Sequence, residues 1–336
     1  NKQMAHNLNE VNGKVAFVGA GVSQKAWHGL GQHFDQQITT RQAIEQGGLN
    51  YGVERIQVFA EVGGQKIALP YYSNYRTDTN DIFDGIVTDR YQILQNVEAF
   101  DFFDSFLIEE GNETIITTAG ALGKGETIFI TAKLPEYIRI GNSEDVIENF
   151  LLLTHSHDGG SPVQVMFTPV RVVCNNTLNA ALRGNKGKIT FRHTNSVKEK
   201  LNSVKSIMQL TNTTTRLVGE LFNDLAKTKM HIPMKDFVLR VLNPDGGREL
   251  TALEKEGLST RLINQANEIL EYNETSETQM MFPHMRGTKF GALNAITGFY
   301  QNVKSFKTLD SKFSSIFMDN GLVKNQTDKA LQILLS

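Results

Sequence analysis

The stretch LLLTHSHDGGSPVQVMFTPVRVVCNNTL, residues 151–178, decides how the fold is interpreted. Two apolar runs flank the turn-forming sequence HDGGSP, and this pattern is typical of a β-hairpin. We therefore predict two strands joined by a bend at residues 158–160. Because side chains alternate along a strand, His155 and His157 are expected on the same face.

Two histidines at this spacing are compatible with two ligands of one metal ion. A catalytic metal usually needs three protein ligands, and the third would have to be Asp158, Cys174 or His193. The hairpin alone is the simpler interpretation, so we expect no metal, no cofactor and no catalytic residue here. A metal-dependent phosphodiester hydrolase that uses His155, His157 and Asp158 remains the alternative. Cys174 lies in an apolar run and is expected to be a small buried residue.

The first half of the chain has the pattern of strands separated by turns. RIQVFAEVGGQKIALP, residues 55–70, alternates on both sides of a Gly-Gly pair, which is a hairpin signal. A second strand pair is expected in residues 113–135, where Ile- and Thr-rich runs flank a glycine-rich connection. Apolar residues recur at helical spacing in residues 96–110, so one helix packs within this part.

The pattern changes to helices after about residue 194. SVKE at residues 196–199 and TALE at residues 251–254 have capping-box spacing and are each expected to open a helix. The sequence therefore predicts an α+β fold. Its antiparallel, β-rich core domain with packed helices spans residues 1–195, and a helical C-terminal region, residues 196–336, packs on that core.

Length and composition limit the class of protein. At 336 residues, the chain suggests roughly two domains. Its single cysteine excludes an internal disulfide framework and fits a reducing compartment. The first residues lack the apolar core of a signal peptide, and no apolar run approaches the roughly 18 residues of a membrane span. We expect a cytoplasmic protein without a membrane partner.

Two glycine-rich stretches resemble nucleotide-binding loops but lack the residues that hold phosphate. VAFVGAGVSQ has Gln24 where the third glycine belongs. GALGKGET, residues 120–127, has Glu126 where a phosphate-binding loop needs lysine. Both are predicted to be turns.

Charge is segregated along a chain whose net charge is only -2. Residues 76–113 hold ten acidic residues against two basic ones, a balance of -8, whereas residues 171–205 hold eight basic residues against Glu199 alone, a balance of +7. Cationic side chains near glycine-rich backbone bind phosphate without reading base sequence, although a solvated polar face is the ordinary alternative. A lone tryptophan can stack on a base or anchor a core. The predicted nucleic-acid-binding residues are Arg171, Arg183, Lys186, Lys188, Arg192, His193, Lys198 and Trp27.

Seven short motifs occur in order along the chain: WHGLG at 27–31, YRTDT at 75–79, DRYQILQNVEAFDFFD at 89–104, AGALGKGETIFITAKLP at 119–135, LLLTHSHDG at 151–159, FTPVRVVCNNTL at 167–178 and RHT at 192–194. Together they resemble the phage/plasmid-like protein family, which is built around domain of unknown function 932. The resemblance covers about residues 4–200, and a weaker similarity extends to GTKFGALNAITGFYQNV. It implies work on mobile-element DNA, or against host defences, in the cytoplasm of a bacterial host cell. It supplies no reaction and no catalytic residue.

These observations favour a non-enzymatic, phage- or plasmid-encoded protein that binds nucleic acid. We expect it to assemble as a homo-oligomer on single-stranded DNA and to assist annealing, recombination or replication, because weak contacts add up when subunits act together along a strand. The metal-dependent hydrolase is one alternative. The other is an interaction protein that acts on a host defence factor through the acidic segment, residues 78–113.

Overall fold

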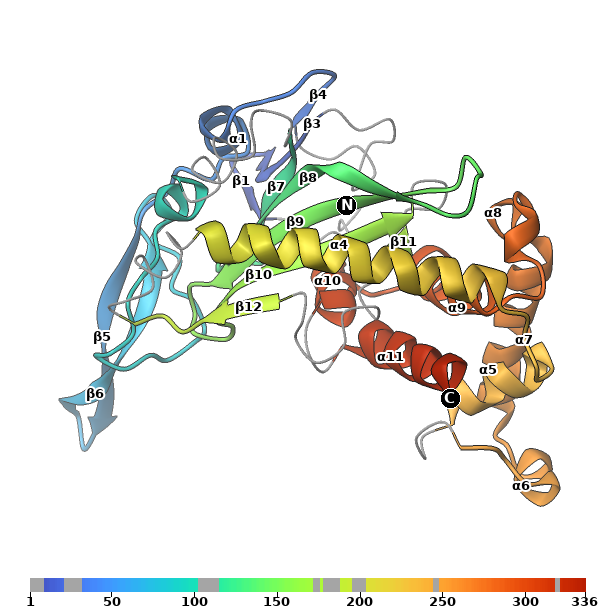
Figure 1. The fold of residues 1–336 in the computed structure, drawn as a ribbon. Helices are drawn as coiled ribbons and strands as arrows, with labels where there is room; N and C mark the ends of the chain where they lie inside the picture. Colours follow the sequence, from blue (N-terminus) through green and yellow to red (C-terminus); the bar gives the residue numbers. More distant parts are fainter. Residues whose placement is uncertain are drawn as a thin grey trace. The chain divides into compact units, whose positions relative to one another are not determined.

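The computed structural model describes residues 9–20, 32–101, 115–171, 176–177, 188–194, 204–243, 248–317 and 321–336. Within them the fold is α+β, as predicted, with most strands in the N-terminal half and most helices in the C-terminal half (Figure 1). The chain divides into two compact units. Unit 1 comprises Asn1–Pro135, Phe150–Phe167 and Lys188–Leu210, and unit 2 comprises Glu136–Asn149, Thr168–Gly187 and Thr211–Ser336. The predicted domain boundary between residues 195 and 196 lies outside the described residues and stays a prediction.

Eight strands of the described chain form one sheet, in the order β11-β10-β9-β8-β7-β3-β4, with β12 also paired to β10. The pair β3–β4 is parallel, and β3–β7, β7–β8, β10–β11 and β10–β12 are antiparallel. The strands are β3 (Phe17–Ala20), β4 (Gln32–Phe34), β7 (Ile115–Leu122), β8 (Thr127–Arg139), β9 (Val146–Ser156), β10 (Val163–Arg171), β11 (Asn176–Thr177) and β12 (Lys188–Phe191).

The predicted hairpin of residues 151–178 is confirmed for the described residues, because β9 and β10 are neighbouring strands of the sheet. The bend follows from its sequence. Asp158 accepts hydrogen bonds through Oδ1 from the hydroxyl of Ser156 and from the backbone N–H of Gly160, 2.7 Å away. Gly159 has φ +80°, a conformation that glycine adopts at little cost.

Two other predicted turns in this half are also confirmed, whereas the turn predicted in VAFVGAGVSQ lies largely outside the described residues, with Gly19 in β3. β5 (Val53–Val62) and β6 (Gln65–Arg76) pair about Gly63 and Gly64, whose φ values are +59° and +78°, as the common two-residue hairpin turn requires. The phosphate-loop look-alike joins β7 to β8, so a strand and not a helix follows Glu126. A small hairpin, β1 (Glu10–Val11) with β2 (Lys14–Val15), precedes β3. Helix α1 is Thr40–Gln46, and residues 96–101 form the described start of the helix predicted for residues 96–110.

Unit 2 is mainly helical. Its buried element is α9 (Lys289–Gly298), whose residues from Phe290 onward are all buried and which contacts α7 and α11. The capping box at Thr251 is confirmed: its side chain accepts from the Glu254 N–H, and the Glu254 carboxylate accepts from the Thr251 N–H. The SVKE box lies outside the described residues. The elements are α4 (Val204–Lys227, which begins in unit 1), α5 (Met234–Leu242), α6 (Ala252–Glu256), α7 (Thr260–Thr275), α8 (Glu277–Met280), η4 (Pro283–Met285), η5 (Phe299–Val303), α10 (Leu309–Phe317) and α11 (Leu322–Leu335).

Among the helices of the described chain, none is both long enough and apolar enough to cross a membrane.

Candidate functional site

Three histidines meet inside unit 1. His155 and His157 lie at the end of β9, on one face as predicted, with ring centroids 4.7 Å apart. The pairing of β12 with β10 brings the RHT motif beside them, so that the His193 ring lies 5.7 Å from the His155 ring. All three side chains are buried. The fold therefore brings His193 close to His155 and His157, which the sequence alone could not establish.

A metal-dependent hydrolase would require these histidines and Asp158 to share one ion. Within the part of the chain that the structure describes, no group of three His, Cys, Asp or Glu side chains is placed to hold a metal ion. Asp158, the third member of the hydrolase alternative, is engaged by Ser156 and Gly160 in the hairpin bend. Cys174 lies outside the described residues. The geometry thus gives no support to a metal-dependent hydrolase.

The orientation of His157 follows from its neighbour Asn96. The Asn96 side-chain amide donates from Nδ2 to the Leu49 carbonyl over 2.9 Å, so its Oδ1 faces the His157 ring. His157 Nε2 lies 2.8 Å from that oxygen and must carry the proton, because an amide oxygen only accepts. His157 Nδ1 is therefore an acceptor, and it has no hydrogen-bond partner among the described residues.

His193 is fixed in a similar way. Its Nδ1–H donates to the Gln92 carbonyl over 3.2 Å, and its own carbonyl accepts from the Gln92 N–H over 3.0 Å. The ring stacks on Tyr91 at 4.6 Å, with an angle of 20° between the planes. His155 differs from the other two, because neither of its ring nitrogens has a hydrogen-bond partner in the described chain.

Burial lowers the pKa of all three imidazoles. The pKa of His157 falls to about 3, mainly by desolvation and further by the charges of His193 and Arg76. The pKa of His155 is held well below its usual value by desolvation, then by His157 and His193. For His193 desolvation also dominates, although the Gln92 and Ser161 carbonyls act in the opposite direction. At neutral pH the three imidazoles are therefore uncharged, each with one N–H donor and one acceptor nitrogen.

A buried guanidinium lies close to this cluster. The Arg76 side chain is 2% exposed and forms two hydrogen bonds with the Asp78 carboxylate, at 2.9 and 2.8 Å. It also donates to Asn9 Oδ1 over 2.6 Å and stacks over the Tyr51 ring at 3.6 Å. The Tyr51 hydroxyl in turn donates to the Gly125 carbonyl, 2.6 Å away, and desolvation raises its pKa despite the opposing effects of Arg76 and Asn96.

The buried residues described above form one network, here called the polar core, which consists of Tyr51, Arg76, Asn96, His155, His157 and His193. Three of its members were not predicted as site residues. Arg76 and Asn96 lie within the motifs YRTDT and DRYQILQN, which was a usable signal, whereas nothing around Tyr51 marked it. A network of this kind can hold neutral imidazoles in a dry interior and position the segments that carry them.

The predicted nucleic-acid-binding residues are only partly described. Lys188 opens β12 and is half-buried, while Arg192 follows that strand and is exposed. His193 is 7% exposed, so its ring is packed inside unit 1 and not offered to solvent. Arg171 ends β10, where it is the register partner of Asn176, and its side chain is not described. The remaining predicted residues, Arg183, Lys186, Lys198 and Trp27, lie outside the described residues.

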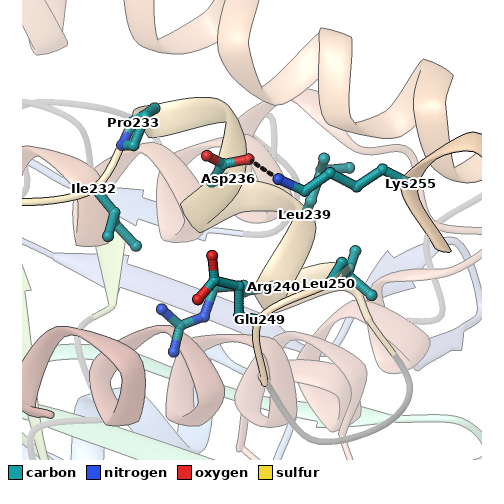
Figure 2. Close-up of a pocket in the computed structure, with 8 residues that line it drawn as sticks. All are labelled: Ile232, Pro233, Asp236, Leu239, Arg240, Glu249, Leu250 and Lys255. Atoms are coloured by element: carbon teal, nitrogen blue, oxygen red, sulfur yellow. Dashed lines mark hydrogen bonds and ion pairs between the residues drawn. The ribbon is translucent and has the colours of Figure 1, made fainter. Parts of the chain in front are cut away.

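A small pocket lies in unit 2 beside α5. Its edge carries an ion pair between Asp236 and Lys255 at 2.7 Å, with Arg240 and Glu249 on the other side (Figure 2). The volume is about 100 Å³, which is below the roughly 300 Å³ at which small-molecule sites begin. We therefore do not assign a ligand to it.

Comparison with known protein families identifies the family of this chain. The model of the family described as Domain of unknown function (DUF932) matches residues 85–327, which is most of the chain. The protein belongs to this family. The match begins later than the resemblance of residues 4–200 and continues through most of the helical unit. No curated protein and no solved structure matches the chain.

Proposed function

We propose that the protein binds nucleic acid, with single-stranded DNA as the expected partner, through the basic segment, residues 171–205. The observation that carries this proposal is the +7 balance of that segment in a chain of net charge -2. Concentrated cationic charge binds phosphate backbones and releases counterions, a favourable term that does not depend on base sequence. In this proposal the protein is non-enzymatic, acts in the bacterial cytoplasm and serves a phage or plasmid.

The described end of the basic segment has features that support this role. β12 pairs only with β10 among the described strands, so it lies at an edge of the sheet. Arg192 is exposed, and the next residue, His193, is buried against Tyr91. Because His193 fixes the adjacent backbone, Arg192 loses less conformational entropy when it binds a phosphate.

The polar core then has a structural role within the same proposal. His193 ties the end of β12 to the start of the DRYQ motif through its two hydrogen bonds with Gln92. We therefore assign His193 to anchoring this segment, while Lys188 and Arg192 contact the phosphates. Assembly of several subunits along one strand would multiply these few contacts and would suit annealing, recombination or replication.

The test is a gel shift with single-stranded oligonucleotides of unrelated sequence. Wild-type protein should bind them with similar affinity at low salt, and Arg192→Ala should weaken each of them by a similar factor. Arg41→Ala is the matched control, because Arg41 is an exposed cation of unit 1 far from the basic segment in sequence. Absence of binding at low salt, or equal effects of the two variants, would refute the proposal.

One observation favours the interaction protein as a second candidate. In the acidic segment, Ile82 and Ile86 are 50% and 64% exposed, and their sequence neighbours Asp81, Asp84 and Asp89 are also exposed, with Asp84 paired to Lys124. Apolar side chains surrounded by carboxylates suit a basic, partly apolar protein surface. If nucleic-acid binding fails, loss of partner capture from a host lysate on Ile86→Asp, but not on Val97→Asp, would support this candidate.

A further inference from the structure

Residues 57–71 of the β5–β6 ribbon, here called the arm, extend beyond the rest of unit 1 (Figure 1). The base of the ribbon is anchored. The backbone N–H and carbonyl of Val53 bond to the Gln95 side chain over 3.0 and 2.8 Å, and Tyr72 pairs with Val87. The arm itself makes no hydrogen bond to any other segment that the structure describes. It is held by its own strand pairing and by the Gln57 side-chain amide, which donates to the Leu69 and Tyr71 carbonyls.

Large apolar side chains of the arm face solvent. Phe59, Val62, Ile67 and Tyr71 are between 44% and 63% exposed. A two-stranded ribbon is at best marginally stable in water, and exposed apolar clusters mark interaction sites. The arm therefore has the composition and geometry of a strand pair that gains stability when another strand is added.

The two outer edges of the arm differ in how they are protected. β6 carries Lys66 and Pro70, and both residue types hinder the addition of a further strand. β5 has neither residue type between Gln57 and Val62, where its sequence is QVFAEV; its pairing with β6 shifts register between Gln57 and Phe59 and is regular from Phe59 to Val62. An edge without such protection is a template for another β-strand. The β5 edge is therefore the edge of the arm that can accept another strand.

We propose that the β5 edge pairs with β5 of a second copy of this chain, antiparallel about a two-fold axis at Ala60. This register places Val58 opposite Val62 of the partner subunit, and Phe59 opposite Glu61 of the partner subunit. Opposed residues share a face of the sheet, so valine meets valine and Ala60 meets its own copy on one face, Phe59 lies opposite a glutamate on the other, and no two like charges lie opposite each other. The β5 edge is thus complementary to itself, as a two-fold interface requires.

The pairing involves the five residues 58–62 of each chain, and so short a contact buries much less than the roughly 1,200 Å² of surface that stable interfaces need. Association through the arm alone is therefore weak and depends on concentration. It becomes effective when the subunits are held close together, for example on one nucleic-acid strand. The pairing itself requires no nucleic acid, so it can be tested separately from the proposed function.

The first experiment is site-directed cross-linking in a Cys174→Ser background, which removes the only cysteine. Residues that face each other across an antiparallel pair have Cα atoms about 4.5–5.5 Å apart, within the range of a disulfide. Ala60→Cys should therefore give a disulfide-linked dimer under mild oxidation. Lys66→Cys, the control on β6, should stay monomeric. No dimer with Ala60→Cys, or equal cross-linking at both positions, would overturn the proposal.

The second experiment is sedimentation of the protein without nucleic acid over a range of concentrations. The wild type should associate as concentration rises, and Val62→Lys should weaken that association at least tenfold. Ile86→Lys is the matched control, because Ile86 is equally exposed, at 64% against 63%, but lies outside the arm. A wild type that stays monomeric throughout, or equal effects of the two substitutions, would contradict pairing through β5.

Discussion

His157 donates a hydrogen bond from Nε2 to Oδ1 of Asn96 over 2.8 Å, although 61 residues separate the two in sequence. Both side chains are fully buried. Because Asn96 also donates to the Leu49 carbonyl, this contact joins the end of β9 to the DRYQILQN motif and to the segment after α1. Through this hydrogen bond, the motifs LLLTHSHDG and DRYQILQN contribute to one buried interior.

Replacing Asn96 by Leu should destabilise the protein strongly. The substitution leaves the His157 N–H and the Leu49 carbonyl buried without partners, and each such group costs roughly 1–3 kcal/mol. Val97→Ala, at the neighbouring 46% exposed position, should change the free energy of unfolding by less than about 0.5 kcal/mol. Urea unfolding measures both. Similar values for the two variants would show that the contact contributes little.

His155→Leu should behave in the opposite way. His155 is fully buried and has no hydrogen-bond partner in the described chain, so an apolar side chain removes a desolvation cost without breaking a bond. We expect the free energy of unfolding at pH 7 to stay equal or to rise by about 1 kcal/mol. A loss of more than about 2 kcal/mol in urea unfolding would mean that His155 has a partner, such as an ordered water molecule.

Stability should fall as the pH drops below about 6.5. In the unfolded chain histidine binds a proton near pH 6.5, whereas His157 in the folded protein does so only near pH 3, and the pKa of His155 is also well below its usual value. Between these limits the unfolded state holds more protons, so each histidine removes up to about 1.4 kcal/mol per pH unit. The measurement is the free energy of unfolding from pH 7 to pH 4.5.

His155→Leu supplies the control for this pH dependence. Because the variant lacks one of the titrating groups, its stability should fall less steeply with acid than that of the wild type. An identical slope for wild type and variant would contradict the assignment of a depressed pKa to His155.

The substitution Gly125→Ala tests how tightly the side chain of Arg76 is packed. A Cβ at this position would lie 2.7 Å from Arg76 Nη1 and 2.9 Å from the Tyr51 hydroxyl, and φ is +101°. Gly48 also has positive φ, at +63°, but a Cβ there meets nothing within 4 Å. Gly48→Ala should therefore cost only the backbone term of about 1–2 kcal/mol, and Gly125→Ala roughly 1–3 kcal/mol more. Equal losses in thermal unfolding would show that the guanidinium can move away freely.

Much of the fold could be predicted from local sequence, because turn chemistry acts over a few residues. The bend at Asp158, the Gly63-Gly64 hairpin and the capping box at Thr251 were all recognised in this way. The polar core could not be, because it depends on long-range packing. The sequence indicated that His155 and His157 share a face, but only the pairing of β12 with β10 shows that His193 joins them.

Charge patterns in the sequence do not predict which charged side chains are exposed. The basic segment was chosen from its composition, which does not distinguish a buried His193 from an exposed Arg192 one residue away. The stacking of His193 on Tyr91, which buries its ring while Arg192 stays exposed, separates the two residues, and it is a property of the fold. The same limit applies to Arg76, which composition counts only as one of the two cations of residues 76–113 but which the fold buries.

The salt dependence of binding to single-stranded DNA tests the central claim most directly. The logarithm of the affinity of the wild type should fall linearly with the logarithm of salt concentration. The Lys188→Ala/Arg192→Ala double variant should lower the slope by about 1.4, or about 0.7 for each lost phosphate contact. Arg41→Ala should leave the slope unchanged, and circular dichroism should confirm that all three proteins are folded. A wild type that does not bind, or a double variant with an unchanged slope, would contradict nucleic-acid binding through this segment.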